Sequence, residues 1–185
     1  IRSVVPCCED IVMRFIFGIV VALATVLPAP ASAAPPERSE ISRFLVSQGF
    51  AVLKLSKLPT GHEVIDVVIN GQAGTFVLDS GAGATVLRQD RLTKFGIVSA
   101  TDKQQGAGAG GSIAITRHPI GSIVLDGQAL PLRHVYSTNL DSVVGRLRAA
   151  TGIEIDGVVG QDVLSGFAAI INIGSSELYL KLPAG

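Results

Sequence analysis

The sequence predicts a mainly β, or all-β, fold, and its composition and local patterns point there together. Glycine accounts for 21 of the 185 residues, aromatic residues make up only 5%, and tryptophan is absent. Short apolar stretches alternate with polar residues and end at glycine, asparagine or aspartate, which is typical of short strands joined by tight turns. With 48% hydrophobic residues, the chain is long enough to form one domain around a proper core.

The charge pattern argues against a polyanionic partner. Lysine plus arginine equals aspartate plus glutamate at 15 each, and no run of one sign occurs. We therefore expect neither nucleic acid nor an anionic membrane surface as a partner. His62, His118 and His134 are scattered without the spacing of metal ligands, so neither a metal nor another cofactor is expected.

The first 33 residues have the features of an export signal. Met13 is the only methionine and precedes Arg14, a 13-residue apolar run over 15–27 and the small-residue pattern Ala31-Ser32-Ala33. We predict a signal peptide over 13–33, cleaved after Ala33, with 1–12 as upstream translated residues outside the fold. The protein is then periplasmic or secreted and free of the membrane. An uncleaved anchor is the alternative, although the run is shorter than the ~20 residues of a membrane span.

The mature chain must hold together without disulfides, because Cys7 and Cys8 both precede Met13. We expect an N-terminal leader over 34–58, containing a short helix at 41–48, and a single domain over 59–185. A first strand falls at 52–55.

The strongest local signal is a hairpin that ends at an aspartate. An apolar run over 63–69 leads into Asn70-Gly71, the most characteristic two-residue hairpin turn, and the return strand covers 75–78. Asp79 thus stands where a buried strand leaves the sheet.

The rest of the chain predicts further hairpins and short helices. A helical turn over 87–95 is expected to end at Gly96, and residues 139–150 are irregular or weakly helical. Asp156-Gly157 is interpreted as a turn. The remaining expected elements are strands beginning near Ile113, at 120–125, 130–136, 168–173 and 178–182, a turn at Asp126-Gly127, and a short helix over 161–167.

Asp79 carries the chemistry that the sequence suggests. A lone carboxylate is costly to bury, whereas two carboxylates a few Å apart share one proton, so that one acts as an acid and the other as a base. Water held between them can attack a peptide carbonyl. Gly81 lets the backbone approach the carboxylate, and the Ser80 hydroxyl is suited to hydrogen bonds between neighbouring loops.

The strand ending in Asp79-Ser80-Gly81-Ala82 resembles the catalytic signature of the retropepsin-like aspartic proteases, and the resemblance covers about 61–182. It is most like the single-domain, exported bacterial members. It implies a closed acid-protease barrel with one or two short helices. It also implies a flap containing Gly106, Gly108, Gly110 and Gly111, and a late motif, Val158-Val159-Gly160, that supports the site. One departure is Gly83, where Thr or Ser is commoner, although Thr85 is close by.

The resemblance implies a homodimer, since the chain has no second Asp-Ser/Thr-Gly. Two Asp79 carboxylates, one from each subunit, would form the site of an aspartic endopeptidase that cleaves a peptide or unfolded protein. A noncatalytic peptide-binding or interaction domain of the same fold is the alternative. A small structural module held at the envelope by an uncleaved signal is a third.

Two other motifs are weaker. Gly106, Gly108 and Gly111 satisfy G-x-G-x-x-G, but a strand pattern follows them where a dinucleotide site needs a helix. No G-x-S-x-G elbow of a serine hydrolase occurs. Asp-Ser-Gly on its own is also a common turn, so the surrounding pattern decides its interpretation.

Overall fold

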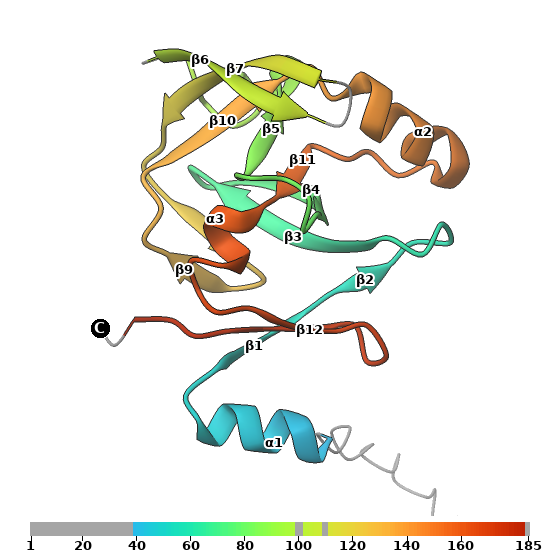
Figure 1. Ribbon diagram of the computed structural model, residues 1–185, viewed down its shortest axis with the longest axis vertical. Coiled ribbons are helices and arrows are strands. Elements are labelled where there is room, and N and C mark those ends of the chain that lie inside the picture. The colour runs from blue at the N-terminus through green and yellow to red at the C-terminus, as the bar shows by residue number, and fades with distance from the viewer. Residues whose placement is uncertain (1–38, 99–101, 109–110, 184–185) are drawn as a thin grey trace, which may run out of the picture. The chain divides into compact units, whose positions relative to one another are not determined.

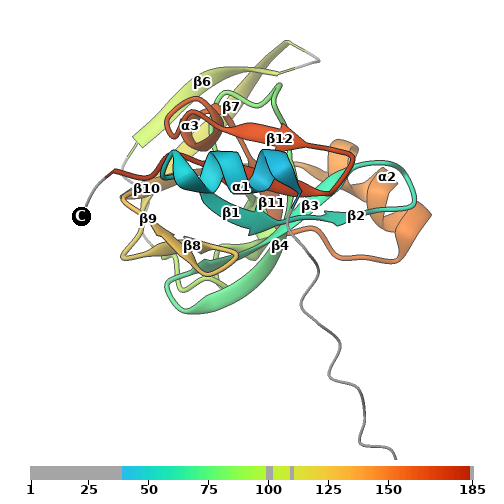
Figure 2. The ribbon, with the colours of Figure 1, turned by 90° about the horizontal axis from the view of Figure 1, so that it is seen from below.

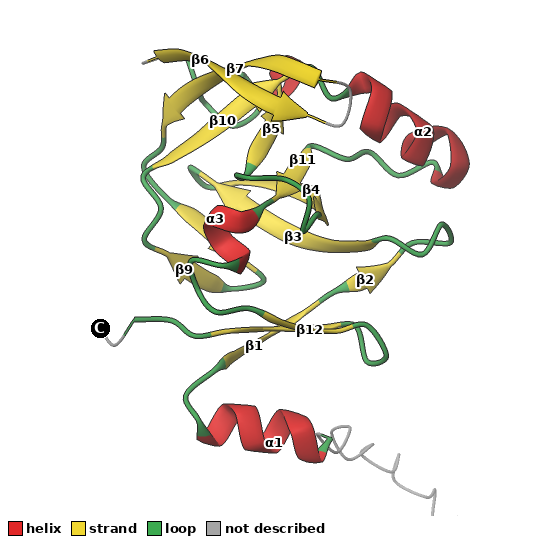
Figure 3. Cartoon of the chain, viewed as in Figure 1, coloured by secondary structure: helices red, strands yellow, loops and turns green. Residues whose placement is uncertain are grey.

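The computed structural model describes residues 39–98, 102–108 and 111–183, which belong to one compact unit, Arg38–Gly185. Residues 1–12 and the predicted signal peptide lie outside the described residues. Within them, no helix is both long and apolar enough to cross a membrane. Strands dominate this unit (Figures 1 and 3), which confirms the mainly β class with short helices.

The described elements follow one another as short strands interrupted by three α-helices and one 3₁₀ turn. The helical elements are α1 (Glu40–Ser47), the 3₁₀ turn Gln89–Arg91, α2 (Asp141–Thr151) and α3 (Gln161–Leu164). The strands are β1 (Ala51–Lys54), β2 (Ser56–Lys57), β3 (Glu63–Ile69), β4 (Gln72–Leu78), β5 (Val86–Arg88), β6 (Asp102–Gly108), β7 (Gly111–Pro119), β8 (Ile123–Leu125), β9 (Gln128–Leu130), β10 (His134–Thr138), β11 (Gly157–Val159), β12 (Ile170–Asn172) and β13 (Glu177–Leu180).

Two sheets organise these strands. The larger one runs in the order β6-β7-β10-β5-β11-β4-β3-β8-β9, with β2 pairing beside β3. The smaller one has the order β1-β13-β12. Most neighbouring strands are antiparallel, but β11 runs parallel to β4 and β10 runs parallel to β5. Each parallel pair joins two segments that are distant in the sequence. The pair of β11 with β4 includes the strand that precedes Asp79.

Both predicted two-residue turns are present. Asn70 and Gly71 have φ values of 51° and 81°, and Asp126 and Gly127 have 40° and 80°. Positive φ at both central residues is the requirement of the type I′ hairpin turn, which asparagine or aspartate followed by glycine meets at low cost. The first turn fixes the register of β3 against β4, and therefore the point at which β4 ends.

β4 is apolar on both of its faces because each face packs into a different cluster. Phe76 belongs to the main core, whereas Val77 packs into a second cluster with Leu58, Val64, Val144, Leu147, Ile155 and Val158. A strand covered on both sides reads as a continuous apolar run rather than an alternating one. Burial on both faces holds the end of β4 firmly in place.

The segment expected as a leader is part of the compact unit. β1 pairs with β13, with Val52 opposite Tyr179, and β2 pairs with β3. The predicted helix forms as α1, which lies against the smaller sheet (Figure 2) and buries Leu45 while Phe44 stays exposed. The compact unit therefore begins at Arg38 rather than at residue 59.

Two other segments differ from expectation. Residues 139–150, expected to be irregular or weakly helical, form most of α2, which buries Val144 and Leu147 and ends at Gly152 with a φ of 71°. Residues 87–95 form the end of β5 and a 3₁₀ turn rather than one helical segment. Gly96 follows with a positive φ, as expected of a helical stop.

Glu177 is a buried acid that stabilises the smaller sheet. Its carboxylate accepts hydrogen bonds from Lys54 Nζ at 2.8 Å, Ser175 Oγ at 2.8 Å and Tyr179 Oη at 2.6 Å. Hydrogen bonds from Lys54 and Tyr179 lower the pKa of Glu177 to about 2, against burial, which raises it. The pKa of Tyr179 is raised, mainly by burial and next by the hydrogen bond to Glu177.

This carboxylate predicts a loss of stability in acid. Because the folded pKa of about 2 lies below the unfolded value of 4.5, its stabilisation is complete above about pH 5 and is lost as pH falls toward 2. Between pH 6 and pH 3 we expect the wild type to lose about 1 to 2 kcal/mol more unfolding free energy than Glu177→Gln, allowing for solvent screening of Lys54. Urea denaturation at both pH values measures this difference. The exposed Glu40→Gln is the control, and an equal loss in all three proteins would contradict the prediction.

Candidate active site

Asp79 follows directly after β4 and is held at its backbone and at its side chain. Its N–H donates to the carbonyl of Val159 at 3.0 Å, and Ala82 N–H donates to the Asp79 carbonyl at 3.2 Å. The carboxylate Oδ1 accepts a hydrogen bond from Gly81 N–H at 2.8 Å. The half-buried carboxyl group is thus fixed in direction, neither sealed inside the core nor projecting freely.

The two residues after Asp79 have different environments. A Cβ at Gly81 would lie 3.2 Å from Asp79 Oδ1, tighter than an ordinary contact, in accord with the close approach expected there. Ser80 is exposed, and its carbonyl accepts a hydrogen bond from Gln161 Nε2 at 2.7 Å. The role expected for the Ser80 hydroxyl stays a prediction.

The late motif lies beneath the loop that carries Asp79. β11 is inserted between β4 and β5, with Val159 opposite Leu78 and Val158 opposite Val86. Residues 79–85 must therefore cross β11 to connect β4 with β5. Gly160 lies where this loop comes closest, since a Cβ there would be 2.3 Å from the carbonyl oxygen of Ala84. The structure thus brings the late motif into contact with the loop of Asp79.

Thr85 joins the two segments, a contact that the sequence did not indicate. Its buried hydroxyl donates to Asp162 Oδ1 at 2.8 Å and accepts from Gly160 N–H at 3.4 Å. Gln161 N–H also donates to the Ala82 carbonyl at 2.9 Å. Asp162, in the first turn of α3, thus anchors the loop of Asp79. Its pairing with a threonine distant in sequence has no local signal.

A cavity of about 380 Å³ opens beside Asp79. Leu78, Val77 and Val158 supply apolar walls from β4 and β11. The remaining walls come from α2, through Val143, Arg146 and Leu147, and from His62 before β3. His62 is exposed and also borders this cavity. The contribution of α2 to the cavity was not predicted, because that segment was expected to be irregular or weakly helical.

Asp156 is buried rather than placed in a turn, which corrects the interpretation of Asp156-Gly157. It is 3% exposed, and its Oδ2 accepts from Thr75 N–H at 3.1 Å and from Lys94 Nζ at 2.8 Å. Gly157 opens β11, where a Cβ would lie 2.4 Å from the carbonyl oxygen of Val86. Asp156 borders Thr75, whereas Asp79 lies four residues further along the chain, about 13 Å away at the spacing of a strand. It is therefore not the second carboxylate.

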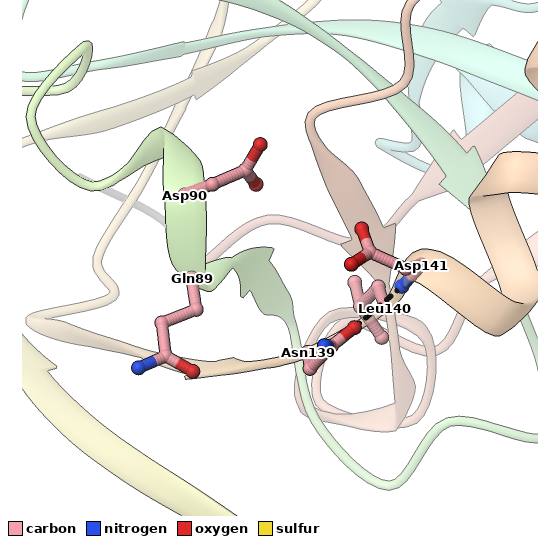
Figure 4. A pocket seen from close by; sticks show the side chains of 5 residues that line it. All are labelled: Gln89, Asp90, Asn139, Leu140 and Asp141. Atoms are coloured by element: carbon pink, nitrogen blue, oxygen red, sulfur yellow. Dashed lines mark hydrogen bonds between the residues drawn. The ribbon is translucent and has the colours of Figure 1, made fainter.

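A second cavity, of about 290 Å³, contains two other acids (Figure 4). Asp90 and Asp141 border it together with Gln89, Asn139 and Leu140. Both carboxylates contact the guanidinium of Arg88, at 2.8 and 3.7 Å. Both acids therefore already have a cationic partner in Arg88. We therefore place the candidate active site at Asp79.

The glycine-rich segment forms the hairpin of β6 and β7. Gly106 pairs with Ile113 and Gly108 with Gly111, while Gly110 lies outside the described residues. A Cβ at Gly106 would be 3.3 Å from Ile115 Cδ1. The antiparallel hairpin agrees with rejection of a dinucleotide motif, which needs a helix at this point. Its expected action as a flap stays a prediction.

The comparisons identify the family. The sequence model of the aspartyl protease family matches residues 65–163, which include Asp79 and the late motif. The chain therefore belongs to the aspartyl protease family, which confirms the resemblance drawn from these residues. A retropepsin-like aspartic protease from Rickettsia conorii is similar at 17% identity and a TM-score of 0.47, over 71% of this chain and 90% of that one. No curated protein matches.

Proposed function

We propose that the protein is an aspartic endopeptidase that acts as a homodimer, in which the two Asp79 carboxylates activate one water molecule. The observation that carries this proposal is the fixed, half-buried carboxylate of Asp79 beside an apolar cavity of about 380 Å³. Membership of the aspartyl protease family supports it. Ser80, which directly follows Asp79, is exposed, so the loop has an accessible edge at which a second copy can meet it.

The chemistry follows from two carboxylates that share one proton. The charged carboxylate takes a proton from water as the oxygen attacks the peptide carbonyl, while the protonated one donates to the carbonyl oxygen. The resulting tetrahedral species collapses when the nitrogen of the leaving amine accepts a proton and the C–N bond breaks. The pair titrates as a unit, so each apparent pKa belongs to both residues. Apolar walls around Asp79 would receive a side chain of the peptide.

Cleavage of an unfolded protein tests the proposal directly. We expect hydrolysis at one or more pH values between about 3 and 8, the range in or below which paired carboxylates titrate. A peptide analogue with a hydroxyl in place of the scissile carbonyl should inhibit it, because it resembles the transition state. Peptide binding without cleavage at any pH would instead favour the noncatalytic alternative.

The dimer can be tested separately. Sedimentation at several protein concentrations should reveal a monomer–dimer equilibrium, and activity per subunit should rise with the dimer fraction, because a monomer holds only half of the site. A monomer that cleaves at full specific activity would contradict the shared site. We further propose that the enzyme works after export, on the strength of the residues around Met13.

A further inference from the structure

The cavity beside Asp79 contains an arginine that no carboxylate of the described chain neutralises. Arg146 lies on α2, is exposed, and borders the cavity together with Asp79. Two residues along the helix, Arg148 contacts Glu154 at 2.6 Å, and Lys94 contacts Asp156 at 2.8 Å. Within residues 39–98, 102–108 and 111–183, Arg146 forms no hydrogen bond or salt bridge. It differs in this respect from Arg148 on the same helix.

The backbone that carries Arg146 is nevertheless firmly placed. Val144 and Leu147, on either side of it in the sequence, are 2% and 7% exposed and pack in the second cluster with Val77 and Val158. The guanidinium therefore extends from a fixed helix, over a floor that also positions β4 and β11. A guanidinium carried by a fixed backbone beside an apolar floor is suited to a ligand that combines an apolar group with a carboxylate, because its planar donors match carboxylate geometry.

We propose that Arg146 determines specificity by binding a carboxylate of the peptide substrate while an apolar side chain of the same peptide occupies the cavity. This inference rests on the proposed function, since it concerns a peptide bound at Asp79. The substrate carboxylate must stay near Arg146 and away from the like charge of Asp79. In an extended peptide, side chains two residues apart lie on the same side at about 7 Å. We therefore expect the acid two residues from the apolar side chain.

Matched peptides test this recognition. Each pair differs only by glutamate or glutamine, placed two residues from an apolar residue at the scissile bond. With the wild type, the glutamate peptide should have a kcat/KM about tenfold higher than the glutamine peptide. Arg146→Gln should reduce the ratio to about one, and Arg146→Glu should favour a lysine peptide instead. Arg133→Glu, which changes the charge equally at an exposed arginine away from the cavity, is the control and should keep the wild-type ratio. Comparing peptides with free and amidated C-termini shows whether Arg146 binds a side-chain carboxylate or the terminal one.

A binding measurement separates failure of this inference from failure of the proposed function. Cleavage by the wild type without a preference for either carboxylate, or a preference that survives Arg146→Gln, would overturn the inference and leave the endopeptidase intact. Absence of cleavage by the wild type would overturn the endopeptidase. In that event, the affinity of the Asp79→Asn protein for the same peptides still tests whether Arg146 recognises a carboxylate. A preference for the carboxylate that Arg146→Gln removes supports the role of Arg146, and equal affinities refute it.

Discussion

Asp79→Asn should abolish peptide hydrolysis, with a loss of at least about 10³-fold in kcat, while the protein remains folded and dimeric. Asparagine has nearly the same shape as aspartate, and its side-chain oxygen can still accept the hydrogen bond from Gly81 N–H. What it lacks is the ability to take a proton from water. Progress curves on an unfolded protein, together with sedimentation of the variant, measure both properties.

A matched acid and a mixing experiment sharpen this result. Asp66→Asn removes an exposed carboxylate on β3 and should retain full activity. Equal amounts of wild-type and Asp79→Asn subunits, allowed to exchange, should give about half the activity of the same wild-type subunits alone, because mixed dimers have one functional carboxylate. Residual hydrolysis by Asp79→Asn at the wild-type rate would end the assignment of Asp79 as the catalytic residue.

Gly160→Ala should destabilise the protein by about 3 kcal/mol or more and greatly reduce activity. The added Cβ would lie 2.3 Å from the carbonyl oxygen of Ala84 and 2.6 Å from that of Ala82. Both obstacles are backbone atoms of the loop that carries Asp79, so relief requires the loop to move. The φ of Gly160 is −112°, which alanine adopts readily, so the effect is one of space rather than backbone strain.

Gly83, which lies in the loop that carries Asp79, provides the control. Gly83→Ala places its Cβ where no heavy atom lies within 4 Å, and its backbone is not in the positive-φ region. We expect a change within about 0.5 kcal/mol. Urea denaturation of both variants distinguishes local crowding from a general sensitivity of the loop. Equal stability of Gly160→Ala and the wild type would show that the loop can shift away from β11 at little cost.

The sequence was most informative where a local pattern determines the structure. Asn70-Gly71 predicted a hairpin because few other residues tolerate its positive φ values. The apolar strand ending at Asp79 was recognisable because both of its faces are covered, so its apolar residues are continuous. The family followed from these residues together with Val158-Val159-Gly160.

Features that depend on distant contacts could not be predicted. Asp156-Gly157 has the composition of a turn, and only the approach of Lys94 and Thr75 makes burial of the acid favourable. The segment of α2 was expected only as irregular or weakly helical, because its helix depends on two buried residues, Val144 and Leu147, rather than on a long apolar face. Its position beside Asp79, and with it the place of Arg146, follows from packing in the second cluster.

The insertion of β11 between β4 and β5 also determines when the loop of Asp79 can first be supported during synthesis of the chain. Thr85 and its partner Asp162 are 77 residues apart, so a growing chain carries Asp79 for several seconds before its support emerges, at about 5–20 residues per second. In a nascent chain that ends before Gly157, β4 and β5 lack the strand with which both of them pair. The loop of Asp79 therefore reaches its final support only after residues 157–164, which form β11 and α3, have been synthesised.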